Sequence, residues 1–187
     1  WYKTSTEIYL NDTLVSQYDG SIAVVPAIDN SLPDGKYGRY YGSEHGADRD
    51  SISLLEKLGA TITREQQIFC WRNLEQTPGQ WTWQEADEYV AECKAADIDI
   101  LGVLGKPSKW ATIEPTEDEI KLKNLSSFPE RWNIRSHDEW ANYIYTTVSR
   151  YKDYVKHWEI INEVNFHPPA NAAAFAGTTE EYFELLR

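Results

Sequence analysis

The stretch that decides the fold is Lys156-His157-Trp158-Glu159-Ile160-Ile161-Asn162-Glu163-Val164-Asn165. It has the pattern of a short apolar strand, over residues 155–161, that ends abruptly in an Asn-Glu pair before a Phe-His-Pro-Pro loop. Such β-favouring, largely apolar runs are typical of strands buried in a parallel sheet. We therefore expect Glu163 to emerge at the carboxyl end of a parallel strand, which is where barrels and open α/β sheets place their chemistry.

The chain before this stretch alternates between strand and helix patterns. Strands are predicted at residues 37–42, 60–64 and 98–104, and the first helix at about 48–58. The intervening helices carry apolar stripes at the helical period: Ile52, Leu55 and Leu58; Ala86, Tyr89, Val90 and Cys93; Trp140, Ile144, Val148 and Tyr151. Capping-box patterns start at Thr82, Ser136 and Thr178, and Gly59 ends the first helix. A long connection at about 106–135 is a candidate active-site loop.

Alternating strands and helices with right-handed crossovers form either a (β/α)8 barrel or an open sheet. The sequence contains no G-x-G-x-x-G or G-K-[ST] loop, which disfavours a nucleotide-binding open sheet. The fold class predicted is therefore α/β, and the family resemblance given below implies a TIM (β/α)8 barrel that is incomplete in this chain. A barrel typically needs about 250 residues, so we expect residues 37–187 to be its first half. The other half would come from the same polypeptide or from a second chain.

Residues 1–36 have a different pattern from the rest. Two short strands are predicted there, at Thr6–Leu10 and Ser21–Ile28, separated by Asn-Asp and Asp-Gly turn signals. This short β-like segment is either the end of a preceding β domain or a hairpin that closes the bottom of a barrel.

Composition excludes several classes of partner. The net charge of -12, with no basic stripe, argues against nucleic acid and anionic membrane surfaces. No apolar run is long enough to span a bilayer, and a secreted or extracellular location is weakly favoured. The four histidines form no H-x-x-x-H cluster, so neither a metal nor a cofactor is predicted. The two cysteines are expected to be free buried thiols rather than a disulfide.

Three stretches resemble clan A glycoside hydrolases, which are retaining enzymes on a (β/α)8 barrel; two of them are long, and the third is the short stretch around Trp110. The first matches their fourth-strand pattern W-E-x-W-N-E-P-N and departs from it at Ile161 and Val164; its matching residues are Trp158, Glu159, Asn162, Glu163 and Asn165. The second, residues 71–83, resembles their loop W-x-x-[IVL]-E-x-x-x-G-x-[WYF]-x-[WF]. The resemblance implies hydrolysis of glycosidic bonds in a poly- or oligosaccharide. The family within the clan is left open.

The resemblance implies specific roles at the strand end. Glu163 would be the general acid/base; the alternative is a solvated carboxylate that merely follows a strand. Holding a proton near neutral pH requires a raised pKa, which either apolar walls or the nearby negative nucleophile would supply. Trp158, Phe166 and the barrel interior are expected to provide the walls. Asn162 would hydrogen-bond the sugar 2-hydroxyl next to the reacting carbon, or else simply turn the chain. The clan's nucleophile lies at the end of the seventh strand, so residues 1–187 alone are expected to be inactive.

Further substrate contacts are implied with a structural alternative for each. Arg64 matches an arginine that keeps the clan's nucleophile ionised, or it forms a structural ion pair. Trp71 is expected to stack on a sugar face. The structural alternative is that the aromatic residues of this loop hold it against the barrel rim. Trp110, in a stretch that resembles the clan's P-x-W-A ending, either lines a subsite or packs under the following loop. The weaker candidates are His45, Asn165 and His167.

Two other functions are compatible with the sequence. The departures at Ile161 and Val164 fit a carbohydrate-binding protein that keeps the barrel but has lost hydrolysis. An unrelated β/α enzyme with Glu163 as a proton-abstracting base would instead carry metal or cofactor ligands in its remaining strands.

Overall fold

The computed structural model describes residues 2–22, 38–40, 50–123, 128–164 and 175–187, which fall into two units, Trp1–Ser31 and Leu32–Arg187. The first unit contains an antiparallel hairpin of β1 (Tyr2–Leu10) and β2 (Thr13–Ile22). Its two-residue turn is Asn11-Asp12, with φ of 48° and 62°, a conformation that these residue types tolerate. The predicted Asn-Asp turn is confirmed, but the predicted Asp-Gly turn is wrong, because β2 runs through Asp19 and Gly20. The predicted strand Ser21–Ile28 shares Ser21 and Ile22 with β2, and its other residues lie outside the described ranges.

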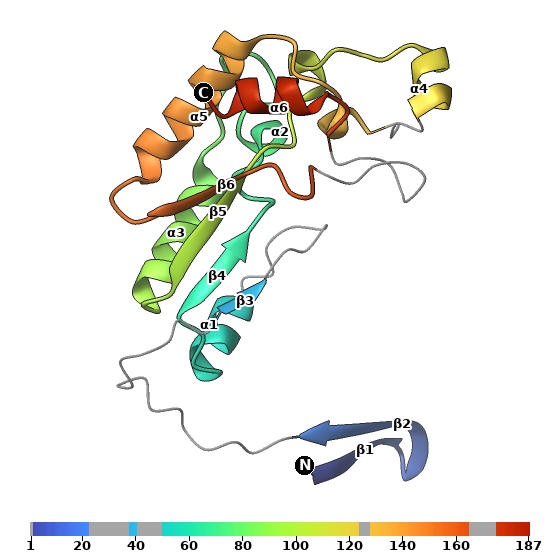
Figure 1. The fold of residues 1–187 in the computed structure, drawn as a ribbon. Coiled ribbons are helices and arrows are strands. Elements are labelled where there is room, and N and C mark those ends of the chain that lie inside the picture. The colour runs from blue at the N-terminus through green and yellow to red at the C-terminus, as the bar shows by residue number, and fades with distance from the viewer. Residues whose placement is uncertain (1, 23–37, 41–49, 124–127, 165–174) are drawn as a thin grey trace. The chain divides into compact units, whose positions relative to one another are not determined.

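The second unit is built on a parallel sheet in the order β3-β4-β5-β6 (Figure 1). These strands are β3 (Gly38–Tyr40), β4 (Ile62–Glu65), β5 (Asp99–Leu104) and β6 (His157–Ile160). Helices separate them along the chain: α1 (Asp50–Lys57), α3 (Gln84–Ala95) and α5 (His137–Tyr151), with α6 (Thr179–Leu185) after β6. The predicted alternation of strand and helix is confirmed, and the strands neighbour one another in chain order.

Side chains alternate between the two faces of this sheet. On the face that meets the helices, Thr63 is fully buried and accepts a hydrogen bond from the Tyr89 hydroxyl of α3 at 3.3 Å. Neighbours in register on that face, such as Ile100 and Leu104, are also buried. On the opposite face, Arg64 and Leu101 remain half-buried. Among the described residues, the helix layer therefore covers one face of the sheet and leaves the other partly open.

An aromatic cluster joins α5 to the loops that follow β4 and β5. The Trp71 and Tyr143 rings stack, with centroids 5.0 Å apart and planes 3° from parallel. The Tyr143 hydroxyl donates to the Phe69 carbonyl at 2.6 Å and accepts from the Gly105 N–H at 3.1 Å. Tyr143 therefore ties both loops to α5.

This bonding sets which face of α5 is buried. The buried residues are Trp140, Tyr143, Thr147 and Tyr151, whereas the predicted Ile144 and Val148 are half-buried. The buried face of α5 is therefore rotated from the predicted one. The reason is that the Tyr143 hydroxyl has buried hydrogen-bond partners, so Tyr143 faces the core, where the prediction had put Ile144.

The helix-end signals are mostly confirmed. The Ser136 and Thr178 side chains accept from the N–H groups of Glu139 and Glu181. The cap at Thr82 is wrong, since Trp83 is the N-cap of α3 and the Thr82 N–H donates to the Leu74 carbonyl. Leu58 was also wrongly placed on the apolar face: α1 ends one residue earlier, and Leu58 is exposed.

Both cysteines are free and buried, as predicted. Burial raises the pKa of the Cys70 and Cys93 thiols to about 12, because a thiolate would lose its hydration there. Neither sulfur is therefore suited to act as a nucleophile near neutral pH.

The long connection after β5 is folded rather than open. It contains η1 (Lys109–Ala111), α4 (Glu117–Lys123) and η2 (Pro129–Arg131). Its two ends meet at an antiparallel bridge between Thr112 and Ile134, and the Asn133 side chain donates to Glu181 of α6 at 2.9 Å. The connection is therefore anchored at the carboxyl edge of the sheet, while α4 lies at its outer end (Figure 1).

An ion pair fastens α3 to α5. The Arg150 guanidinium donates to both carboxylate oxygens of Asp87, and the Tyr151 hydroxyl donates to Asp87 Oδ1 at 2.9 Å. The hydrogen bonds from Arg150 are the main reason that the pKa of Asp87 is lowered from its ordinary value of 3.8. Both charged side chains are 41% exposed, so solvent screens this pair.

We predict that Asp87→Asn lowers the free energy of unfolding by about 0.5–1 kcal/mol at neutral pH. The folded-state pKa is depressed, so this contribution is complete above the ordinary aspartate pKa and is lost as the pH falls through the folded value. Chemical denaturation at pH 7 and at successively lower pH should show the two proteins converging. Asp118→Asn, on exposed α4, is the matched control and should change nothing; a difference for Asp87→Asn that persists unchanged in acid would contradict the assignment.

Candidate active site

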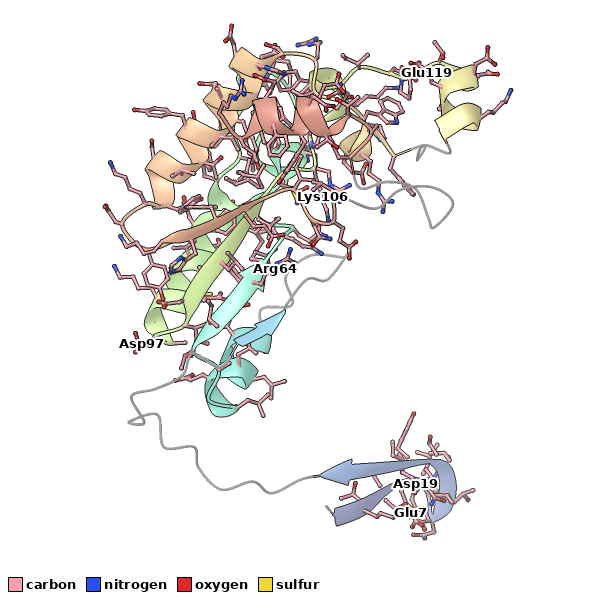
Figure 2. The ribbon with its side chains drawn as sticks, in the orientation of Figure 1. Glu7, Asp19, Arg64, Asp97, Lys106 and Glu119 are labelled. Atoms are coloured by element: carbon pink, nitrogen blue, oxygen red, sulfur yellow. The ribbon has the colours of Figure 1, made fainter. Side chains whose placement is uncertain are left out.

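The carboxyl ends of β4, β5 and β6 form the edge at which the predicted site residues gather. Figure 2 labels Arg64 on β4 and Lys106, which lies two residues beyond the end of β5, the strand that pairs with β4. Asn162 and Glu163 follow β6 after one intervening residue, Ile161. Parallel pairing brings these three strand ends together because every strand runs in the same direction.

Arg64 is the centre of the charge network at this edge. Its Nε and Nη2 donate to the two carboxylate oxygens of Glu159 on β6, at 2.9 and 2.6 Å. The same Nη2 donates to Asn162 Oδ1 at 2.8 Å. The structure therefore brings Arg64 and Asn162 together, although β5 separates their strands.

The backbone turns sharply where β6 ends. Ile161 and Glu163 have φ of 53° and 55°, and left-handed backbone is rare for a β-branched residue such as Ile161. The Ile161 N–H still bonds the Leu104 carbonyl at 2.8 Å. Gly105 fits against this turn, since a Cβ there would lie 3.2 Å from the Ile161 side chain. Left-handed residues on either side of Asn162 therefore bring the amide back toward Arg64.

Glu163 is exposed in the structure. Of the walls predicted for it, Phe166 lies outside the described residues. Trp158 was wrongly assigned as a wall, because its ring packs edge-on against Phe69 at 5.1 Å and shares the buried, helix-facing side of the sheet with Gly102. Phe166 and the barrel interior stay the predicted sources of apolar cover for Glu163.

Trp71 does not present a face to solvent. Its ring is fully buried, stacked on Tyr143 and met edge-on by Trp110 at 5.4 Å. Its indole N–H donates to Glu75 Oε2 at 2.7 Å, and the Gly79 N–H donates to Glu75 Oε1, also at 2.7 Å. The expectation that Trp71 stacks on a sugar is corrected: this part of the motif holds the loop, and Glu75 is its buried fastener.

Trp110 is half-buried and well anchored. Its indole N–H donates to the Glu75 carbonyl at 3.1 Å, and the Arg135 guanidinium lies 5.6 Å from its ring centroid. These contacts favour the packing alternative that the sequence left open. A subsite role for its exposed part stays a proposal.

The remaining predicted site residues, and the presence of metal sites or membrane spans, can be compared only with the residues that the structure describes. His45, Asn165 and His167 lie outside the described residues. Within residues 2–22, 38–40, 50–123, 128–164 and 175–187, no group of His, Cys, Asp and Glu side chains is arranged to hold a metal ion. In the same ranges, no helix has the length and apolarity needed to cross a membrane.

Comparison with known proteins decides the family. The model of glycosyl hydrolase family 10 matches residues 34–180. The chain belongs to glycosyl hydrolase family 10. Members of this clan A family are retaining enzymes on TIM barrels. The endo-1,4-beta-xylanase C of Paenibacillus barcinonensis is 24% identical over 178 residues, which cover 87% of this chain and 16% of that protein.

Solved structures share the fold of this family 10 chain. A family 39 glycoside hydrolase from Bacteroides cellulosilyticus WH2 superposes with a TM-score of 0.59 at 18% identity, covering 87% of this chain and 31% of that one. Xylanase 10B from Thermotoga maritima gives a TM-score of 0.50 at 16% identity, covering 75% and 40%. The chain thus spans less than half the length of each of these relatives.

Two carboxylates that hold this edge of the family 10 chain together were missed by sequence reasoning. Glu159 was matched to the fourth-strand pattern without a role, and Glu75 was matched in the loop without one. A carboxylate inside an apolar strand needs a cationic partner, and Arg64 in another predicted strand was the available signal for Glu159. For Glu75, the available signal was its position between Trp71 and Gly79, four residues away on each side, whose N–H groups donate to its carboxylate.

We predict that Glu75→Ala destabilises the protein by about 2–4 kcal/mol, because it leaves the Trp71 indole N–H and the Gly79 N–H without their buried acceptor. Glu75→Gln keeps one acceptor oxygen and should lie between Ala and wild type. Chemical denaturation measures both, with the exposed neighbour Gln76→Ala as control. Equal stability of Glu75→Ala and Gln76→Ala would contradict the fastening role.

Proposed function

We propose that this chain supplies the first four strands of the catalytic barrel of a retaining glycoside hydrolase, with Glu163 as its general acid/base. The observation that carries the proposal is the position of Glu163. It follows Asn162 three residues past the end of β6, at the carboxyl edge of a parallel sheet, within the stretch matched by the family 10 model. Barrel enzymes place their catalytic residues at this edge.

The reaction would proceed in two steps. Glu163 protonates the leaving oxygen while a second carboxylate attacks the anomeric carbon, and Glu163 then deprotonates the water that releases the sugar. The second carboxylate is proposed to lie at the end of the seventh strand. Asn162 would donate to the sugar 2-hydroxyl, a contact that strengthens in the oxocarbenium-like transition state.

Two features of the sheet support completion of the barrel by further strands. In the observed order, β3 and β6 are the edge strands, and an edge strand offers unpaired backbone groups to a partner. The face opposite the helices carries Arg64 and Glu159, whose side chains are 20% and 34% exposed. We propose that the same polypeptide or a second chain covers this face and encloses Glu163.

The substrate is proposed to be a β-1,4-linked xylose polymer. This rests on the relatives named as endo-1,4-beta-xylanase and xylanase. The net charge of -12 fits a neutral polysaccharide better than a polyanion.

The proposed role of Glu163 is tested by Glu163→Gln in the complete polypeptide. With an aryl glycoside whose leaving group is acidic, the first step needs little protonation and should survive, whereas release of the glycosyl-enzyme should slow by about 10²–10⁴-fold. Stopped-flow kinetics should then show a burst followed by slow turnover. Glu130→Gln, a carboxylate in another ion pair, is the control. Unchanged steady-state turnover by Glu163→Gln would contradict the assignment.

We also predict that purified residues 1–187 hydrolyse no glycoside, because the nucleophile is proposed to lie at the end of a seventh strand, which these four strands do not include. The assay is release of reducing sugar from xylan, with the complete polypeptide as positive control. Turnover by the 1–187 chain would overturn the proposed division of the site. A complete polypeptide that binds xylan without cleaving it would indicate a carbohydrate-binding protein instead.

A further inference from the structure

We infer that Glu159 and Arg64 are positioning residues that fix the orientation of the Asn162 side-chain amide. The pair, here called the amide clamp, would present Asn162 Nδ2 to the sugar and keep Oδ1 turned away from it. This inference rests on the proposed function, because it assigns to the clamp the contact that Asn162 makes with substrate.

The geometry of the amide clamp begins with Glu159. Its carboxylate receives both Arg64 Nε at 2.9 Å and Arg64 Nη2 at 2.6 Å, a two-point contact that fixes the plane of the guanidinium. A single-point ion pair would leave that plane free to rotate. The carboxylate on β6 therefore sets the direction in which the arginine on β4 aims its N–H groups.

Arg64 then sets the direction of the amide. Its Nη2 donates to Asn162 Oδ1 at 2.8 Å. An asparagine amide has nearly the same shape when its oxygen and nitrogen are exchanged, so packing alone does not choose between the two orientations. A guanidinium has donors and no acceptor, so it bonds the oxygen and excludes the flipped amide. Nδ2, the end that can donate to a hydroxyl, is left for the substrate side.

The small contribution that this ion pair can make to folding stability favours a positioning role over a stabilising one. Arg64 and Glu159 are 20% and 34% exposed, and solvent screening leaves such partly exposed ion pairs with only a small contribution to folding. Aliphatic residues on this face would contribute comparable packing without a desolvation cost. What an aliphatic pair lacks is a donor aimed at Asn162 Oδ1.

The position of the clamp supports the same reading. Arg64 and Glu159 lie on strands separated by β5, so their contact spans the sheet below the strand ends. Asn162 lies between two residues of left-handed backbone, Ile161 and Glu163. Because the Asn162 backbone belongs to a turn rather than to the sheet, its side chain depends on the clamp for its orientation.

The test uses the complete polypeptide and a matched pair of substrates. A 4-nitrophenyl β-xyloside or β-xylobioside that the wild type hydrolyses is compared with its 2-deoxy counterpart, lacking the hydroxyl at the reacting sugar. For each enzyme the ratio of kcat/KM between the two substrates is measured, and comparing ratios between enzymes removes the intrinsic reactivity of the substrates.

We predict that Glu159→Gln lowers kcat/KM for the 2-hydroxy substrate by about tenfold and changes the 2-deoxy value by less than about twofold, since one hydrogen bond in the transition state is worth roughly that factor. Arg64→Lys keeps the charge but not the two-point contact, and should give the same pattern. In an Asn162→Ala background, Glu159→Gln should have no further effect on the ratio.

Glu130→Gln is the matched control, because it removes a comparable ion pair with Arg72, of 2.6 Å, away from Asn162. It should leave the ratio unchanged. If Glu159→Gln proves too unstable to assay, Arg64→Lys carries the same prediction. Equal losses on both substrates would overturn the positioning role while leaving the proposed hydrolase intact. A complete polypeptide that hydrolyses no glycoside would overturn the proposed function and this inference together.

Discussion

Parallel pairing of β4, β5 and β6 is the constraint on which the rest of the structure depends. The register places Arg64 opposite Leu101, and Val103 opposite Glu159, so that the arginine on one strand reaches the carboxylate two strands away. The same pairing ends the three strands at one edge, where Asn162 and Glu163 follow. A slip of one residue in β6 would turn Glu159 to the helix-facing side, where an unpaired carboxylate would be buried at a large cost.

The helix-facing side of the sheet and the carboxyl ends of its strands differ in how their backbone is held. The helix-facing side is held by aromatic stacking and by the bonds of Tyr143 to the Phe69 carbonyl and the Gly105 N–H. Strained backbone is found instead at the strand ends, where Lys106, Ile161 and Glu163 all have positive φ. Such strain persists when a rigid surrounding over-determines it, and it is common at functional sites.

The sequence predicted what depends on local pattern. The apolar run at 98–104 gave β5, and the Ser136 and Thr178 caps marked the starts of α5 and α6 correctly. It did not predict contacts between residues distant in the chain. Glu159 and Arg64 are 95 residues apart, and no periodicity joins them. Trp71 was misassigned because an indole that packs in a core and one that stacks on sugar look alike in a sequence.

The most direct test of the central claim is the distance from the Glu163 carboxyl to its nearest facing carboxylate in a crystal structure of the complete polypeptide. The account predicts about 5–5.5 Å, with the second carboxylate at the end of the seventh strand, as retention requires. A separation of about 6.5–9.5 Å would indicate inversion and contradict it. A Glu163 side chain that faces bulk water with no carboxylate opposite would contradict its catalytic role altogether.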